Sequence, residues 1–173
     1  VLFSDFKNFT ERSEHLTPTE LVEELNACFQ AFDRIMGKYG LEKIKTIGDA
    51  YMAAGGLPIP SSQAVNQTIL AALDMQQFMI DRKRNPEFTG AVGFDMRVGI
   101  HTGPVVAGIV GEKKFQYDIW GDAVNTASRM ESNGLIGRVN ISQQTYFLVK
   151  DNPQLVFTPR EAIEIKGKGR KKI

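Results

Sequence analysis

The chain has 173 residues, of which 42% are hydrophobic and 24% are charged, proportions of one globular domain rather than of a disordered or fibrous protein. Its 21 basic and 20 acidic side chains leave a net charge of +1, so we expect no general attraction to nucleic acid or to an anionic membrane. Cys28, the one cysteine, has no partner for a disulfide within the chain, which favours a reducing, cytoplasmic location. The sequence shows no apolar stretch as long as a membrane span and no signal peptide.

The first part of the chain predicts a strand followed by a long helix. Residues 1–6 form a short apolar run, typical of a buried strand. A helix should begin at Pro18, because Thr17 and Glu20 have the spacing of an N-terminal capping box. Apolar residues then recur at steps of three and four, as on one face of an amphipathic helix. Gly40 is a natural end for this helix.

A hairpin and a second helix are expected next. Two short strands are predicted over 44–47 and 51–54, joined by a two-residue Gly-Asp turn at 48–49. Glycine and proline over 55–60 predict a loop, and residues 62–84 then predict a helix. The residues expected on one side of this helix are Val65, Ile69, Ala72, Leu73, Gln76 and Ile80.

Shorter elements complete the chain. Strands are expected over 94–100, 105–110, 139–141 and 163–165, and helices over 121–132 and 143–149. The opening order of strand, helix, two strands, helix and strand is ferredoxin-like. We therefore expect an α+β fold with a ferredoxin-like core, in which helices pack on one face of a mostly antiparallel sheet. Residues 1–173 should form a single domain cut from a longer protein, since no initiator methionine is present.

Two aspartates are the first candidates for a functional site. Asp5 lies at the end of the first predicted strand and Asp49 in the hairpin turn. In a ferredoxin-like sheet the first strand lies beside this hairpin, so the two carboxylates can converge. Such a set of oxygen ligands suits Mg²⁺ or Mn²⁺, and two such ions support phosphoryl or nucleotidyl transfer. Spacing alone favours the simpler interpretation, in which Asp49 is an ordinary turn residue and Asp5 an ordinary strand end.

Five segments, taken together in chain order, support a more specific functional prediction. They are FSDFKNFT (3–10), KIKTIGDAY (43–51), RVGIHTGP (97–104), YDIWGDAVNTASRME (117–131) and IKGKG (165–169). Together they resemble the catalytic domain of the class III nucleotidyl cyclases, and the resemblance extends over the whole chain. Members of that family convert a nucleoside triphosphate to the 3′,5′-cyclic nucleotide and pyrophosphate with two divalent metal ions.

The resemblance implies ligands for these metals and for the triphosphate. The two ions, Mg²⁺ or Mn²⁺, would be held by Asp5, Asp49 and the backbone carbonyl of Phe6. The loop before the next helix would bind the β- and γ-phosphates through its N–H groups, and Lys166 would bind the triphosphate as well. The residues of that loop are Phe6, Lys7, Asn8, Phe9 and Thr10. The family often has glycine where this chain has Asn8, which tolerates a positive φ better than most residues.

Two further positions in the resemblance bear on the choice of purine. Adenine presents an amino donor at N6 and an acceptor at N1, whereas guanine presents an acceptor at O6 and donors at N1 and N2. Lys45 and Asp118 offer a donor and an acceptor that match adenine, whereas a guanylyl cyclase is expected to have Glu and Cys at these positions. We therefore expect ATP as the substrate.

The resemblance also implies catalytic residues on the predicted helix over 121–132. Asn125 and Arg129 are four residues apart, so they share one face of it. In the family the asparagine orients the ribose and the arginine stabilises the charge that develops on the α-phosphate. Taken alone, such a pair usually marks no more than a solvated helix face.

Both halves of the expected site occur in this one chain. In the family each chain gives metal ligands to one site and base contacts to the other, so the resemblance implies a symmetric homodimer with two sites. Two alternatives stay open: a guanylyl or mixed-specificity cyclase, and a catalytically silent module that binds nucleotide. A regulatory domain is expected outside this segment, and neither nucleic acid nor a membrane is an expected partner.

Overall fold

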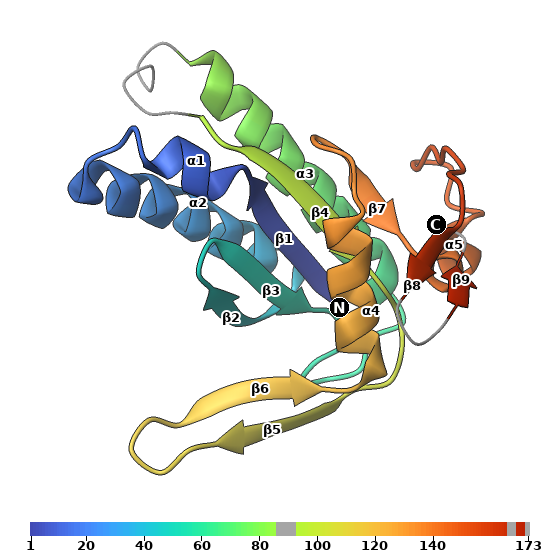
Figure 1. Ribbon diagram of the computed structural model, residues 1–173. Coiled ribbons are helices and arrows are strands. Elements are labelled where there is room, and N and C mark those ends of the chain that lie inside the picture. Colours follow the sequence, from blue (N-terminus) through green and yellow to red (C-terminus); the bar gives the residue numbers. More distant parts are fainter. Residues whose placement is uncertain (86–92, 166–168, 172–173) are drawn as a thin grey trace.

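A five-stranded sheet forms the centre of the protein (Figure 1). The computed structural model describes residues 1–85, 93–165 and 169–171, with the backbone alone from residue 163 onward. In sheet order the strands are β2 (Glu42–Ile47), β3 (Ala50–Ala54), β1 (Leu2–Lys7), β4 (Asp95–Ile100) and β7 (Val139–Ile141). The first four pair antiparallel and β7 pairs parallel to β4. This order confirms the α+β fold and the ferredoxin-like arrangement of β1 to β4.

Helices cover both faces of this sheet, whereas the sequence predicted one face. The helices are α1 (Phe9–Ser13), α2 (Pro18–Tyr39), α3 (Ala64–Arg84), α4 (Asp122–Ser132) and α5 (Gln143–Val149). Leu2 of β1 lies in a hydrophobic cluster with side chains of α2 and α3. Phe3, the next residue, lies in a second cluster with Ala127 of α4. Because successive strand residues point to opposite faces, α4 packs on the face away from α2 and α3.

The boundaries of α2 are those predicted from the local sequence. The Thr17 hydroxyl accepts a hydrogen bond from the Glu20 backbone N–H at 3.3 Å, and the Glu20 carboxylate accepts one from the Thr17 N–H at 2.8 Å. These bonds satisfy N–H groups that the first turn of a helix leaves free. Gly40 ends the helix with φ at 65°, a conformation that favours glycine.

The buried face of α3 is wider than the sequence predicted. Leu73, expected inside, is 43% exposed, whereas Met75 and Met79 are buried. The buried residues of α3 are Ala64, Thr68, Ile69, Ala71, Ala72, Met75, Gln76 and Met79. This helix contacts α2 as well as β4 and β7 of the sheet, so it buries more than the single stripe that a surface helix requires.

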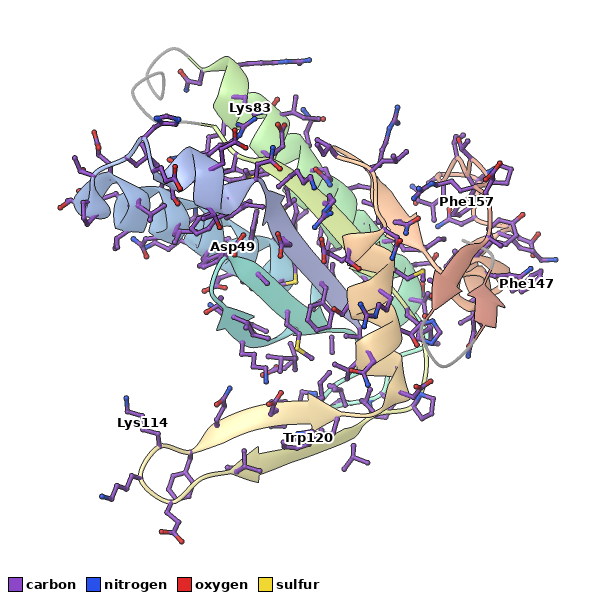
Figure 2. All side chains as sticks on the ribbon, viewed as in Figure 1. Asp49, Lys83, Lys114, Trp120, Phe147 and Phe157 are labelled. Carbon is purple, nitrogen blue, oxygen red and sulfur yellow. The ribbon has the colours of Figure 1, made fainter. Side chains whose placement is uncertain are left out.

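A two-stranded arm projects from the body of the protein (Figure 1). It consists of β5 (Val106–Val110) and β6 (Gln116–Trp120), which pair antiparallel. Lys114 lies near its far end and Trp120 nearer the body (Figure 2). The sequence did not predict three elements, which are strand β6, helix α1 and strand β9 (Gly169–Lys171). Strand β9 pairs with β8 (Ile163–Ile165). Within the described ranges, no helix combines the length and apolarity required to cross a bilayer.

Candidate active site

Asp5 and Asp49 lie at the same end of the β1–β3 pair. The antiparallel register places Ser4 of β1 opposite Tyr51 of β3, one residue from Asp5 and two from Asp49. Figure 2 shows Asp49 at the turn of the β2–β3 hairpin. Burial raises the pKa of Asp5, the negative charge of Asp49 raises it further, and the positive charge of Arg97 opposes this rise. The structure therefore brings these two carboxylates together, as the sequence predicted.

This pair is suited to a divalent cation by its chemistry and its charge. Both groups are hard oxygen ligands, which Mg²⁺ and Mn²⁺ prefer. Repulsion from Asp49 contributes to the raised pKa of Asp5. A cation bound between the two carboxylates would relieve this repulsion. No third histidine, cysteine, aspartate or glutamate joins them within the part of the chain that the structure describes. Remaining positions around an ion would thus be left for water, backbone carbonyls or substrate phosphates.

A buried ion pair lies next to the two aspartates. Arg97 of β4 is the cross-strand neighbour of Asp5, and its Nη2 atom lies 2.8 Å from Oε1 of Glu131 in α4. The pKa of Glu131 is raised to about 7, chiefly by burial; Arg97 opposes the rise, and the charges of Asp5 and Asp49 contribute to it. This pair was not predicted from the sequence, because its two members lie in different segments and contact each other only in the folded chain.

Lys45 and Asp118 meet where β2 passes β6. The Lys45 Nζ atom lies 2.5 Å from Oδ2 of Asp118, and the two side chains are 27% and 11% exposed. The other carboxylate oxygen of Asp118 accepts a hydrogen bond from the Ile119 N–H at 2.8 Å, which fixes the carboxylate. The two residues proposed from the sequence as base contacts are therefore adjacent in space, although 73 residues separate them in the chain.

Asn125 and Arg129 lie on α4 as the sequence predicted. Both are exposed, and their spacing of four residues sets them one turn apart on one face. The opposite face carries the buried residues Ala123, Thr126, Ala127, Met130 and Glu131. Among the described ion pairs none involves Arg129.

The segment over 6–10, predicted as a loop, contains the end of β1, the single turn residue Asn8 and the start of α1. Phe6 is buried and stacks on Phe94 with ring centroids 5.1 Å apart, which fixes the start of the loop. Asn8 has φ at 56° and ψ at 34°, so the turn that glycine would favour forms with asparagine. Arg12 holds α1 to β4, because its guanidinium donates to the carbonyl of Gly93 at 2.5 Å and to the carboxylate of Asp95 at 2.9 Å. Lys7 ends β1, whereas Phe9 and Thr10 begin α1; Lys166 lies outside the described residues.

Comparison with known proteins identifies the family. Residues 1–173 match the family described as the adenylate and guanylate cyclase catalytic domain. The chain belongs to this family. The sequence-based assignment to the class III cyclases is thereby confirmed, and the domain is a nucleotide cyclase catalytic domain.

Both substrate classes occur among the relatives of this cyclase domain. It is 42% identical over 172 residues to an adenylate cyclase of Mycobacterium tuberculosis, covering 98% of this chain and 37% of that protein. It is 41% identical over 170 residues to the human guanylate cyclase soluble subunit beta-2, covering 98% of this chain and 27% of that protein. The crystal structure of the adenylyl cyclase CyaB from P. aeruginosa superposes with a TM-score of 0.91 at 30% identity, covering 99% of this chain and 89% of that one. The chain thus spans about a third of the length of these two curated relatives.

Proposed function

We propose that this cyclase domain converts ATP to 3′,5′-cyclic AMP and pyrophosphate. Overall similarity does not choose between ATP and GTP, since identity to an adenylate and to a guanylate cyclase is 42% and 41%. The observation that carries the proposal is the contact between Lys45 and Asp118, which places a cationic donor and an anionic acceptor side by side in a partly buried site.

Adenine fits the polarity of this pair. Its N1 atom can accept from the Lys45 ammonium and its N6 amino group can donate to the Asp118 carboxylate. Guanine presents an acceptor, O6, where adenine presents its N6 donor, and a donor, N1–H, where adenine presents an acceptor. The O6 atom would therefore face the Asp118 carboxylate, and the N1–H group would face the Lys45 ammonium. Leaving a buried charged group without its partner costs on the order of 1–3 kcal/mol, so this pair supplies a large discrimination between the two purines.

The phosphate chemistry is assigned to the two aspartates and to α4. Asp5 and Asp49, with the Phe6 carbonyl, would hold two divalent cations; such ions supply charge neutralisation and lower the pKa of a bound hydroxyl. The ribose 3′-hydroxyl would attack the α-phosphorus in line with the departing pyrophosphate. Asn125 would orient the ribose, and Arg129 would stabilise the charge that develops on the α-phosphate.

The triphosphate would lie against the loop that joins β1 to α1. The loop residues proposed for the β- and γ-phosphates are Phe6, Lys7, Asn8, Phe9 and Thr10, and Lys166 is proposed as a further ligand. Asn8 in its left-handed conformation turns the chain at the start of α1. Arg12 then fixes this helix to β4 through Gly93 and Asp95, so that the N–H groups of the turn have a defined direction.

We propose a symmetric homodimer as the active form. The arm over 106–120 exposes large apolar side chains: Val106 is 70% exposed, Ile109 69% and Phe115 78%. An exposed apolar surface of this kind is typical of a protein interface. Each protomer would give Asp5 and Asp49 to one site and its base- and ribose-contacting residues to the other. The regulatory domain and the cytoplasmic location expected from the sequence stay predictions.

An assay of both substrates tests the proposal. The purified domain, at high concentration and with Mn²⁺, is supplied with ATP or GTP in parallel, and the cyclic products are separated and quantified. We expect cyclic AMP as the main product. A preference for GTP would contradict the base assignment. Nucleotide binding without any cyclic product would instead support a silent module.

A further inference from the structure

The cross-strand neighbour of a proposed metal ligand is an arginine. Asp5 of β1 and Arg97 of β4 are directly opposite in the antiparallel register. Side chains at such positions lie on one face of the sheet, with Cβ atoms about 5 Å apart. The Arg97 side chain is long enough to form an ion pair with Asp5. In such a pair the Asp5 carboxylate would no longer be free to bind a cation.

In the structure Arg97 is turned toward α4 instead. Its Nη2 atom lies 2.8 Å from Oε1 of Glu131, and its Nη1 atom donates to the carbonyl of Ser132 at 3.2 Å. The side chains of Arg97 and Glu131 are only 17% and 8% exposed. The Nε atom of Arg97 and the Oε1 atom of Glu131 are buried and make no hydrogen bond within the described residues, so the contact between the two side chains is an ion pair rather than a hydrogen bond. The guanidinium is therefore held by the end of α4 and not by the sheet strand beside it.

The position of α4 makes this contact possible. Gly99, two residues from Arg97 on the same face of β4, leaves room for the backbone of Glu131 to lie directly on the strand. Any side chain at Gly99 would collide with that backbone. The close approach delivers the Glu131 carboxylate to Arg97 in a site from which water is largely excluded, where a charge–charge contact is stronger than at the surface.

We propose that Glu131 is a positioning residue of the metal site: it holds Arg97 in an ion pair and so keeps the Asp5 carboxylate open to a divalent cation. This inference rests on the proposed metal role of Asp5 and Asp49. Without the Glu131 charge, the buried guanidinium lacks a compensating partner, and Asp5 is the carboxylate opposite it across the sheet. Because a buried unpaired charge is strongly unfavourable, Arg97 then pairs with Asp5 and competes with the metal.

The test compares the wild-type domain with Glu131→Gln, which keeps the shape of the side chain and removes its charge. Mn²⁺ is titrated without nucleotide at about pH 8.5, and binding is followed by the rise in unfolding temperature. We expect about tenfold weaker binding in the variant (1.4 kcal/mol). In the Mg²⁺ dependence of turnover, the concentration for half-maximal activity should rise by a similar factor, with a much smaller change in the maximal rate. Equal Mn²⁺ binding by the two proteins overturns the proposal.

A double variant distinguishes charge competition from a loss of structure. Arg97→Gln combined with Glu131→Gln removes the competitor together with its partner, so Mn²⁺ binding should return to within about threefold of wild type. Binding as weak as in the single variant would show that Glu131 does not act through Arg97. If Glu131→Gln does not fold, Glu131→Asp, whose carboxylate is shorter, should show the same weakening to a smaller degree, and unchanged binding overturns the proposal.

The variant Asp49→Ala separates this inference from the proposed function. It should show no Mn²⁺-dependent rise in unfolding temperature. If Asp49→Ala binds Mn²⁺ as the wild type does, the metal role of the two aspartates is wrong. If Asp49→Ala fails to bind but Glu131→Gln binds normally, the metal site stands and only the role of Glu131 is refuted.

Discussion

Gly99 of β4 lies so close to Glu131 of α4 that a Cβ atom on Gly99 would overlap the backbone nitrogen of Glu131. Gly99→Ala should therefore push α4 away from the sheet, and with it Asn125 and Arg129. Overpacking of this kind costs about 1–3 kcal/mol. We expect a lower unfolding temperature and a loss of cyclase activity that exceeds the loss of folded protein.

A second glycine provides the control for this prediction. Gly37 lies in α2, and a Cβ atom there would meet nothing within 4 Å. Gly37→Ala should leave activity unchanged and stabilise the protein by about 0.5–1 kcal/mol, since alanine favours a helix interior over glycine. Thermal unfolding and turnover are measured for both variants. An active, undestabilised Gly99→Ala protein would contradict the close contact between α4 and β4.

If each active site is built from residues of both protomers, two variants with defects in different halves of the site should complement each other. Asp49→Ala should abolish turnover because it removes a proposed metal ligand, and Arg129→Ala should strongly reduce it. In a mixed dimer one site combines the intact aspartates of one protomer with the intact Arg129 of its partner. Equal amounts of the two variants, unfolded and refolded together, should recover about one quarter of the wild-type activity, since half of the dimers are mixed and each has one complete site.

The separately refolded variants are the control for complementation. Each should remain inactive at the same total concentration. If the mixture gives no more activity than the two variants assayed apart, the two halves of the site do not come from different protomers.

Substrate choice should follow the pair formed by Lys45 and Asp118. Replacing both, by Lys45→Glu and Asp118→Cys, reverses the donor and acceptor pattern presented to the purine. We expect the ratio of kcat/KM for ATP to that for GTP to fall by roughly a hundredfold. Steady-state assays with both nucleotides measure this ratio. An unchanged ratio would refute base reading by this pair.

The single substitutions separate the two contacts. Each leaves one charged group without its partner in a partly buried site, so both should lower activity with ATP and destabilise the protein more than the double replacement does. Thermal unfolding of the four proteins forms a double-mutant cycle, whose interaction energy combines the Lys45–Asp118 contact with the repulsion that Lys45→Glu introduces beside Asp118.

The elements that the sequence predicted are those whose signals are local. Thr17 and Glu20 define the start of α2 and Gly40 its end, because capping involves neighbouring residues only. The convergence of Asp5 and Asp49 was also predictable, since the order of the first elements fixes which strands are neighbours. Asn8 took up the left-handed turn expected of it for the same local reason.

The features that the sequence did not reveal depend on contacts between distant segments. The ion pair of Arg97 and Glu131 requires that α4 lie on the face of the sheet opposite α2, which no local pattern specifies. Strand β6 was not predicted although residues 116–119 alternate polar and apolar side chains; it pairs with β5 alone, outside the central sheet. Leu73 looked like a core residue of α3, although the packing of that helix leaves it exposed.

Dimer formation should depend on the apolar surface of the arm over 106–120. Phe115, in the connection between its strands, is 78% exposed, and Ile59, in the loop over 55–60, is exposed to the same extent. Phe115→Ser should weaken dimerisation, because burial of an aromatic side chain at an interface is worth about 2 kcal/mol or more. Ile59→Ser is the matched control and should leave dimerisation unchanged.

Sedimentation measures the dimer dissociation constant of each variant, and turnover is followed as a function of protein concentration. Phe115→Ser should raise the dissociation constant about thirtyfold or more and shift the activity to higher protein concentration, with little change in the maximal rate. That pattern follows because each dimer, once formed, still contains both complete sites. A variant that dissociates as little as the wild type would show that the arm does not form the interface. A variant that stays inactive at concentrations where it is fully dimeric would show that Phe115 affects the sites themselves and not dimerisation alone.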